Sequence, residues 1–228
     1  MNNPKTAIIA EAGVNHNGSI DTAKIMIAVA AKAGADFVKF QTFRTEALVT
    51  LAGDTPEYQK ELTGTEESQF TMLKKLELDR AAHEELIQYC ELKGIRFLST
   101  AFDHDSIDLL AELNIPFYKI PSGEITNLPY LRHIGCMGKS LIMSTGMATL
   151  EEVLDALDIL LEAGTKKDKI TCIWVASGTF SQIIFDLGVR LISATDGSKQ
   201  QLMKKPSIVL SPQFYVEVVY LLQIRVHI

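Results

Sequence analysis

The stretch that decides the fold is residues 8–19, IIAEAGVNHNGS, in which a short apolar run stops at Glu11 and continues into Gly, Asn and His. A continuous aliphatic run bounded by turn residues is typical of a buried parallel strand. Ionisable and amide side chains directly after such a strand occupy the edge where α/β sheets and β/α barrels keep their chemistry. Glu11, Asn15 and His16 are therefore the first candidate functional residues. Two structural alternatives stay open, because Glu11 could pair with a lysine and His16 could hydrogen-bond within the turn.

The same pattern recurs along the chain, so that strands and helices alternate. We expect strands at 7–10, 37–41, 96–99, 117–120, 140–144 and 170–175, and helices at 20–33, 68–76, 80–93, 106–113, 128–134 and 150–163. Capping residues and glycines mark several helix boundaries: Ser19, Thr149, Gly34, Gly94 and Gly164. Six successive βα units predict an α/β protein with a parallel sheet, whereas a closed (β/α)8 TIM-type barrel needs eight.

Composition excludes several classes of protein. The chain has 228 residues, 47% apolar and 22% charged, which is enough for one substantial core. A formal net charge of −6 argues against general affinity for nucleic acid. We expect a cytoplasmic protein without a membrane anchor, because no signal peptide and no run of roughly 20 apolar residues is present. Three separate cysteines without a CxxC pair argue against a disulfide framework or a zinc site.

Two lysines lie inside otherwise apolar predicted strands. Lys39 belongs to residues 37–42, FVKFQT, and Lys119 to residues 117–124, FYKIPSGE. A buried cation is costly unless an anion accompanies it. Two lysines at one rim suit a phosphate or carboxylate ligand, although a salt bridge from each to Glu11 or Glu124 is the structural alternative.

Hydroxyl side chains end two further strands, in residues 99–103, STAFD, and 143–147, MSTGM. Hydroxyls followed by glycine before a helix can donate to phosphate oxygens, but for either segment alone helix capping is the stronger interpretation. The other histidines show no metal-ligand spacing, and His83 is expected on an exposed helix face. Four apolar residues are expected in the core: Met72, Leu73, Leu76 and Leu78.

Taken together, five segments resemble the sialic acid synthase family, which includes N-acetylneuraminate and legionaminate synthases and spore-coat polysaccharide relatives. They are residues 9–18, 38–42, 97–103, 119–127 and 144–147, and the likeness extends over about residues 6–170. The resemblance implies a (β/α)8 barrel that condenses phosphoenolpyruvate with an N-acylated mannosamine-type sugar. The implied products are phosphate and a nine-carbon 2-keto sugar acid.

The resemblance also implies roles for individual residues. Glu11 and Glu124 correspond to catalytic-site carboxylates, and the substrate-binding set comprises Lys39, Lys119, Ser122, Ser144, Asn15 and Thr100. Mn²⁺ or Mg²⁺ is the cofactor that the family implies, and a homodimer is a further expectation.

The chain departs from the family pattern after residue 170. The family's later histidine-bearing metal-binding segments are not found, and basic residues outnumber acidic ones in this part. We therefore expect a synthase-like barrel portion over 1–170, a divergent tail over 171–228 from truncation or a frameshift, no C-terminal antifreeze-like domain, and little metal-dependent activity. Two alternatives remain: a deoxy-octulosonate phosphate type of synthase, or an inactive partial barrel that only binds.

Overall fold

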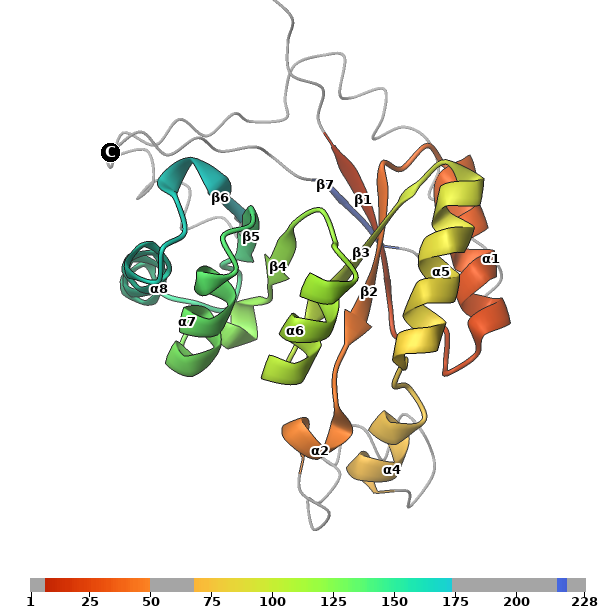
Figure 1. Ribbon diagram of the computed structural model, residues 1–228, viewed down its shortest axis with the longest axis horizontal. Helices are drawn as coiled ribbons and strands as arrows, with labels where there is room; N and C mark the ends of the chain where they lie inside the picture. The colour runs from red at the N-terminus through yellow and green to blue at the C-terminus, as the bar shows by residue number, and fades with distance from the viewer. Residues whose placement is uncertain (1–6, 50–67, 174–216, 221–228) are drawn as a thin grey trace, which may run out of the picture.

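The computed structural model describes residues 7–49, 68–173 and 217–220, in which parallel strands follow one another along one wall (Figure 1). In one sheet, β1 (Ile8–Gly13), β2 (Phe37–Thr42) and β3 (Arg96–Ala101) pair in parallel order. In the other, β4 (Tyr118–Ile120), β5 (Leu141–Ser144) and β6 (Ile170–Ile173) do the same. Because β3 lies beside β4, the two sheets continue each other. The prediction of six successive βα units is confirmed.

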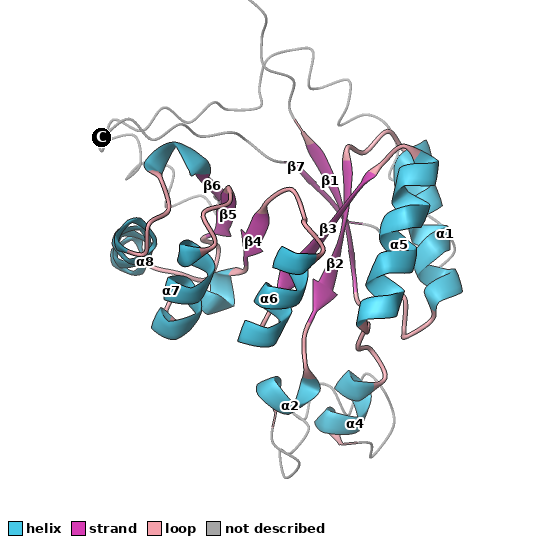
Figure 2. Cartoon of the chain, viewed as in Figure 1, coloured by secondary structure: helices cyan, strands magenta, loops and turns pink. Residues whose placement is uncertain are grey.

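Helices flank the strands, as crossover connections between parallel strands require (Figure 2). The α-helices are α1 (Ile20–Lys32), α2 (Thr45–Leu48), α4 (Gln69–Lys74), α5 (Arg80–Lys93), α6 (His104–Glu112), α7 (Leu128–Cys136) and α8 (Leu150–Glu162). Two single 3-10 turns, η1 (Ser122–Glu124) and η2 (Lys167–Lys169), precede α7 and β6. The sequence predicted every one of these α-helices except the four-residue α2.

Local chemistry explains where the helices begin and end. The Ser19 side chain accepts a hydrogen bond from the Thr22 amide, and Thr149 forms a reciprocal capping box with Glu152. Gly94, directly after α5, has φ +68°, a left-handed conformation that other residues adopt at a cost. These boundary predictions are confirmed.

Side-chain alternation divides the apolar residues into two clusters on opposite faces of the strands. The larger cluster joins the outer faces of the strands to the helices and includes Val38, Phe40 and Tyr118. The smaller cluster lies on the other face, where Ile9, Phe37, Leu98, Ile142 and Ile173 pack together with Phe117. We call this second cluster the apolar floor, since it lies on the face that a β/α barrel encloses.

A further strand, β7 (Glu217–Tyr220), pairs antiparallel with β1. It falls within the β-prone run for which the sequence predicted an edge strand. The long polar segment at 55–65 and most of the tail expected at 171–228 lie outside the described residues. The division between a barrel portion and a divergent tail therefore stays a prediction.

Some predictions about individual side chains need correction. His83 is fully buried rather than exposed, because its ring is on the face of α5 that contacts β2 and β3. Leu78 is buried as predicted, whereas Met72, Leu73 and Leu76 are only half-buried. All three cysteines are free thiols. Among the described helices, none combines the length and apolarity needed to cross a bilayer.

Candidate functional site

A ring of polar side chains lies directly above the apolar floor. In each of the first five strands, the residue two positions after a floor residue is polar: Glu11, Lys39, Thr100, Lys119 and Ser144. Because side chains in a strand alternate between faces, residues two apart point to the same side. These five residues, which we call the polar ring, therefore lie on the inner face toward the carboxyl ends of the strands, where β/α barrels hold their substrates.

Lys39 is the best-connected member of the polar ring. Its Nζ lies 2.6 Å from Glu11 Oε2 and donates a hydrogen bond to Thr100 Oγ1 at 3.1 Å. The β1–β2 register places Glu11 opposite Lys39, which explains the ion pair. Only 10% of the Lys39 side chain and 22% of the Glu11 side chain are exposed, so the pair is largely shielded from water. The ion-pair alternative raised from the sequence is thus confirmed for Lys39.

Lys119 occupies the same kind of position in β4 but has a different environment. Its Nζ donates to the carbonyl oxygen of the adjacent Ile120 at 3.0 Å, and no carboxylate within the described residues forms an ion pair with it. Burial, with the positive charge of Lys39 adding to it, lowers the pKa of Lys119 to about 7, although the Glu11 carboxylate acts in the opposite direction. The expected salt bridge from Lys119 is therefore not formed.

The other predicted site residues are less closely associated with the Lys39–Glu11 pair. Ser122 and Glu124 lie in η1, just beyond β4, and Glu124 Oε2 accepts a hydrogen bond from Asn127 Nδ2 at 2.7 Å. Asn15 is exposed in the loop after β1. The structure thus brings Glu11, Lys39 and Thr100 into direct contact, with Lys119 close enough to feel their charges, while Glu124 contacts Asn127 instead.

His16 is fully buried in the turn after β1 and serves that turn. Its Nδ1 accepts a hydrogen bond from the Gly18 amide at 3.0 Å, so the neutral ring carries its proton on Nε2. Burial, assisted by nearby His83, lowers the pKa of His16 to about 4. His16 is therefore uncharged at neutral pH.

A second polar network, which the sequence analysis missed, lies on the outer face of the same strands. His83 Nδ1 is 2.8 Å from the Asp79 carbonyl oxygen, which can only accept, so Nδ1 donates and Nε2 accepts from the Thr42 hydroxyl at 2.8 Å. Thr42 Oγ1 in turn lies 2.6 Å from Ser99 Oγ. We call Thr42, His83 and Ser99 the outer network. The spacing of His83, Leu86 and Cys90 on α5, three and four residues apart, is the signal that could have revealed the buried histidine.

Ser99 and Thr100 therefore do not cap the following helix, as the capping interpretation of this segment suggested. Asp103 is the N-cap of α6, and it accepts hydrogen bonds from the Ser106 amide and hydroxyl. Another missed residue is Gln41, which follows Lys39 by two positions on β2 and so shares its face. A Cβ at Gly13 would lie 3.7 Å from Gln41 Nε2 and 3.5 Å from Glu11 Oε1, which locates both side chains beside this glycine.

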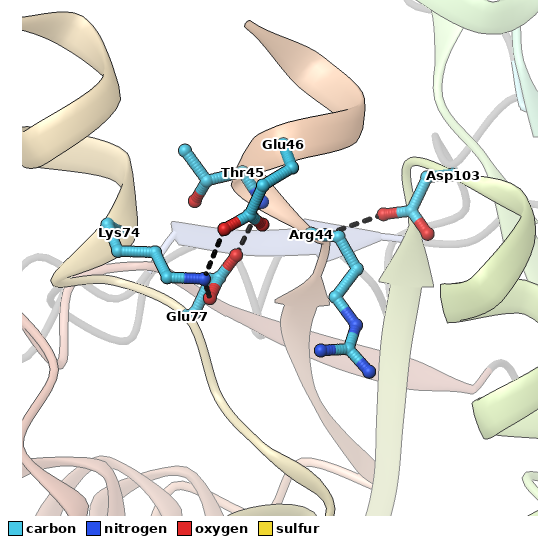
Figure 3. A network of polar contacts seen from close by, with 6 residues as sticks. All are labelled: Arg44, Thr45, Glu46, Lys74, Glu77 and Asp103. Carbon is cyan, nitrogen blue, oxygen red and sulfur yellow. Dashed lines mark hydrogen bonds and ion pairs between the residues drawn. The ribbon is translucent and has the colours of Figure 1, made fainter. Parts of the chain in front are cut away.

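Ion pairs and backbone contacts fix the rim beyond β2 (Figure 3). Lys74 Nζ bridges Glu46 at 2.8 Å and Glu77 at 2.6 Å, and Glu77 also accepts from the Thr45 amide. On the other side, the Arg44 amide donates to Asp103 Oδ2 at 2.7 Å, while its guanidinium points away from this contact. The rim is thus tied to both α4 and α6, which holds the end of β2 in place.

A cavity of about 580 Å³ lies outside the strands, next to this rim. Its lining includes Arg44, Lys74, Arg80, Asp105 and Glu112, and none of the eight predicted site residues. We assign the candidate site to the polar ring instead, because the predicted side chains converge there and a pair of largely buried opposite charges marks it.

The described part of the chain does not fit a divalent metal. Within residues 7–49, 68–173 and 217–220, no three His, Cys, Asp or Glu side chains come together as ligands. Glu11, the carboxylate of the polar ring, is already engaged by Lys39.

Comparison with known proteins gives the family. The NeuB family model matches residues 26–177. The chain is 52% identical over 167 residues to the N,N'-diacetyllegionaminic acid synthase of Campylobacter jejuni, covering 73% of this chain and 50% of that protein. It is 49% identical over 151 residues to the enzyme of the same name from Legionella pneumophila, covering 66% of this chain and 42% of that protein. The chain thus spans about half the length of the curated relatives it matches.

Solved structures give the same result for the fold. The N-acetylneuraminic acid synthetase of Leptospira borgpetersenii, solved with citrate, matches 78% of this chain and 56% of its own, with 28% identity and a TM-score of 0.62. A Thermotoga maritima DAHP synthase matches 73% of this chain and 41% of its own, with 15% identity and a TM-score of 0.52, which bears on the fold alone. The expected α/β fold of the TIM-barrel type is confirmed, and the chain belongs to the NeuB family.

Proposed function

We propose that the polar ring binds phosphoenolpyruvate for condensation with an N-acylated amino sugar, giving a nine-carbon 2-keto sugar acid and phosphate. The observation that carries this proposal is the convergence of Lys39 and Lys119 near a single carboxylate, Glu11. A site with two amines and one carboxylate favours an anionic ligand, and phosphoenolpyruvate carries both a phosphate and a carboxylate.

The roles within the site follow from side-chain chemistry. Lys39 and Lys119 neutralise the phosphate and carboxylate, and the hydroxyls of Thr100, Ser122 and Ser144 donate hydrogen bonds to their oxygens. Carbon–carbon bond formation brings the enol of phosphoenolpyruvate onto the aldehyde carbon of the sugar, so positioning of the two reactants is a large part of the catalysis. Glu11 orients or deprotonates the water that adds at C2. Asn15 and Glu124, at the edge of the site, are proposed to contact the sugar.

The family resemblance also suggests Mn²⁺ or Mg²⁺, which would polarise the aldehyde. Because the described residues lack a suitable ligand set, no step is assigned to a metal here. A homodimer is proposed on the same resemblance, and light scattering of the purified chain would test it.

Among possible sugars, legionaminic acid precursors are favoured by two relatives near 50% identity that are named as N,N'-diacetyllegionaminic acid synthases. A relative with 34% identity is named N-acetylneuraminate-9-phosphate synthase, so a phosphorylated sugar is the alternative to test. Phosphate release should be measured with phosphoenolpyruvate and either unphosphorylated or 6-phosphorylated N-acyl mannosamine-type sugars. We expect release only with the unphosphorylated sugars, and preference for a phosphorylated one would contradict this choice.

Substitution of the lysines tests the binding site itself. Lys39→Ala or Lys119→Ala should raise the apparent KM for phosphoenolpyruvate tenfold or more, since each removes a cation from a dianionic ligand. Unchanged kinetics in either variant would refute the assignment of that lysine. A thermal shift with phosphoenolpyruvate but no phosphate release would instead support a barrel that binds without turnover.

A further inference from the structure

Lys39 and Lys119 share an inner face but not a charge environment. Lys39 has a carboxylate partner at 2.6 Å and a hydroxyl acceptor at 3.1 Å. Lys119 has only the carbonyl oxygen of Ile120, at 3.0 Å. The polar ring therefore contains two amines but one carboxylate, and that carboxylate is already held by Lys39.

The charged groups that act on Lys119 are few. Lys39 from β2 opposes its protonation and Glu11 from β1 favours it, and within the described residues these are the two charges that perturb it appreciably. Since Glu11 is 2.6 Å from Lys39, the two charges largely cancel at Lys119. What remains is burial, which disfavours an ammonium group without a counter-ion and brings the pKa of Lys119 to about 7.

We propose that Lys119 is largely uncharged in the empty site above neutral pH, and that it takes up one proton from solvent when phosphoenolpyruvate binds. This inference rests on the proposed function. An anion beside Lys119 supplies the missing counter-charge, so the ammonium form becomes the stable one. The step is balanced: a proton from the buffer forms one N–H bond on Nζ, and no other bond forms or breaks.

This behaviour has a consequence for affinity. A ligand that binds only the protonated form has an apparent Kd that is divided by the fraction of protein in that form. Above pH 7 the Kd for phosphoenolpyruvate should therefore rise up to tenfold per pH unit, while below pH 7 Lys119 is already charged and adds no further pH dependence.

The first experiment examines the empty protein. The ¹³Cε signals of labelled lysines should be followed by NMR from pH 5.5 to 10.5, with Lys119→Arg to assign the signal. We expect the Lys119 signal to titrate with a midpoint near 7, and Lys39→Gln to move that midpoint upward because it removes the opposing charge. A midpoint near 10 in the unsubstituted protein would overturn the proposal.

The second experiment measures the proton directly. Phosphoenolpyruvate should be titrated calorimetrically at pH 8 into the full chain, in buffers with different ionisation enthalpies. The dependence of the heat on buffer should show uptake approaching one proton per ligand, and Lys119→Arg should bind without uptake because a guanidinium stays charged. Lys139→Arg is the matched control, since Lys139 lies outside the polar ring and donates to Asn114 and Ile115; it should keep the uptake.

The outcomes separate the two proposals. Saturable binding with heat independent of buffer would overturn proton uptake and leave the proposed function intact. No binding in any buffer would overturn the proposed function and proton uptake with it, while the NMR midpoint would still decide whether Lys119 is uncharged in the empty site.

Discussion

The two faces of β1–β3 carry polar groups of opposite kinds. On the outer face, Thr42, His83 and Ser99 are at most 2% exposed, are uncharged and satisfy one another. On the inner face, Glu11 and Lys39 carry full charges, and Glu11 Oε1 has no hydrogen-bond partner within the described residues. The outer network is closed and serves stability, whereas the polar ring keeps hydrogen-bonding capacity for a ligand.

The largest expected effect comes from breaking the charge pair of the inner face. Glu11→Gln leaves Lys39 buried without a counter-ion, which should lower the free energy of unfolding by about 3 kcal/mol. Urea denaturation measures this loss. The matched control is Glu85→Gln, which removes the partner of Lys24 in a surface pair of similar length, 2.5 Å. Because both side chains of that pair are more exposed, the control should cost less than about 1 kcal/mol. Equal losses in the two variants would show that the polar ring is open to water.

The outer network provides the next test. Thr42→Val removes the hydroxyl that joins His83 and Ser99, leaving two buried polar groups without a partner, and should cost about 2 kcal/mol in unfolding free energy. Affinity for phosphoenolpyruvate should stay the same, since Thr42 faces away from the ring. Thr100→Val on the inner face should give the reverse pattern, a smaller loss of stability and weaker binding. Weaker binding in Thr42→Val alone would break the distinction between the two faces.

The smallest expected effect is the acid sensitivity that His16 adds. Its pKa is lowered to about 4 in the folded protein, so between pH 6.5 and 4 the unfolded chain binds more protons than the folded one. Stability therefore falls as the pH drops through this range, by about 1 kcal/mol from pH 7 to 5.5 for this residue. In His16→Gln, thermal unfolding should depend less steeply on pH over the same range. A slope as steep as in the unsubstituted protein would mean that His16 is protonated in the folded state.

Much of the fold and part of the site could be predicted from sequence, for identifiable reasons. Buried parallel strands have aliphatic runs and helices have caps, so the six βα units and boundaries such as Thr149 follow from local patterns. A polar residue two positions after a large apolar one in successive strands places Lys39 and Lys119 at one rim. The pairing of Lys39 with Glu11 rather than Glu124 depends on the register between β1 and β2, which no local pattern specifies.

The buried His83 was missed because histidine suits solvent as well as a satisfied interior site. Its environment depends on hydroxyls from two distant strands, Thr42 and Ser99, which only the assembled wall brings together. The rim contacts of Lys74 with Glu46 and Glu77 likewise join separate segments and leave no periodic signal.

The most direct test of the central claim is a crystal structure of the chain with phosphoenolpyruvate. The account predicts ligand density on the inner face, with the phosphate and carboxylate oxygens within hydrogen-bond distance of the Nζ atoms of Lys39 and Lys119. Phosphoenolpyruvate bound instead in the outer cavity beside Arg44 and Arg80, with the Lys39–Glu11 pair undisturbed and no ligand above the apolar floor, would contradict it.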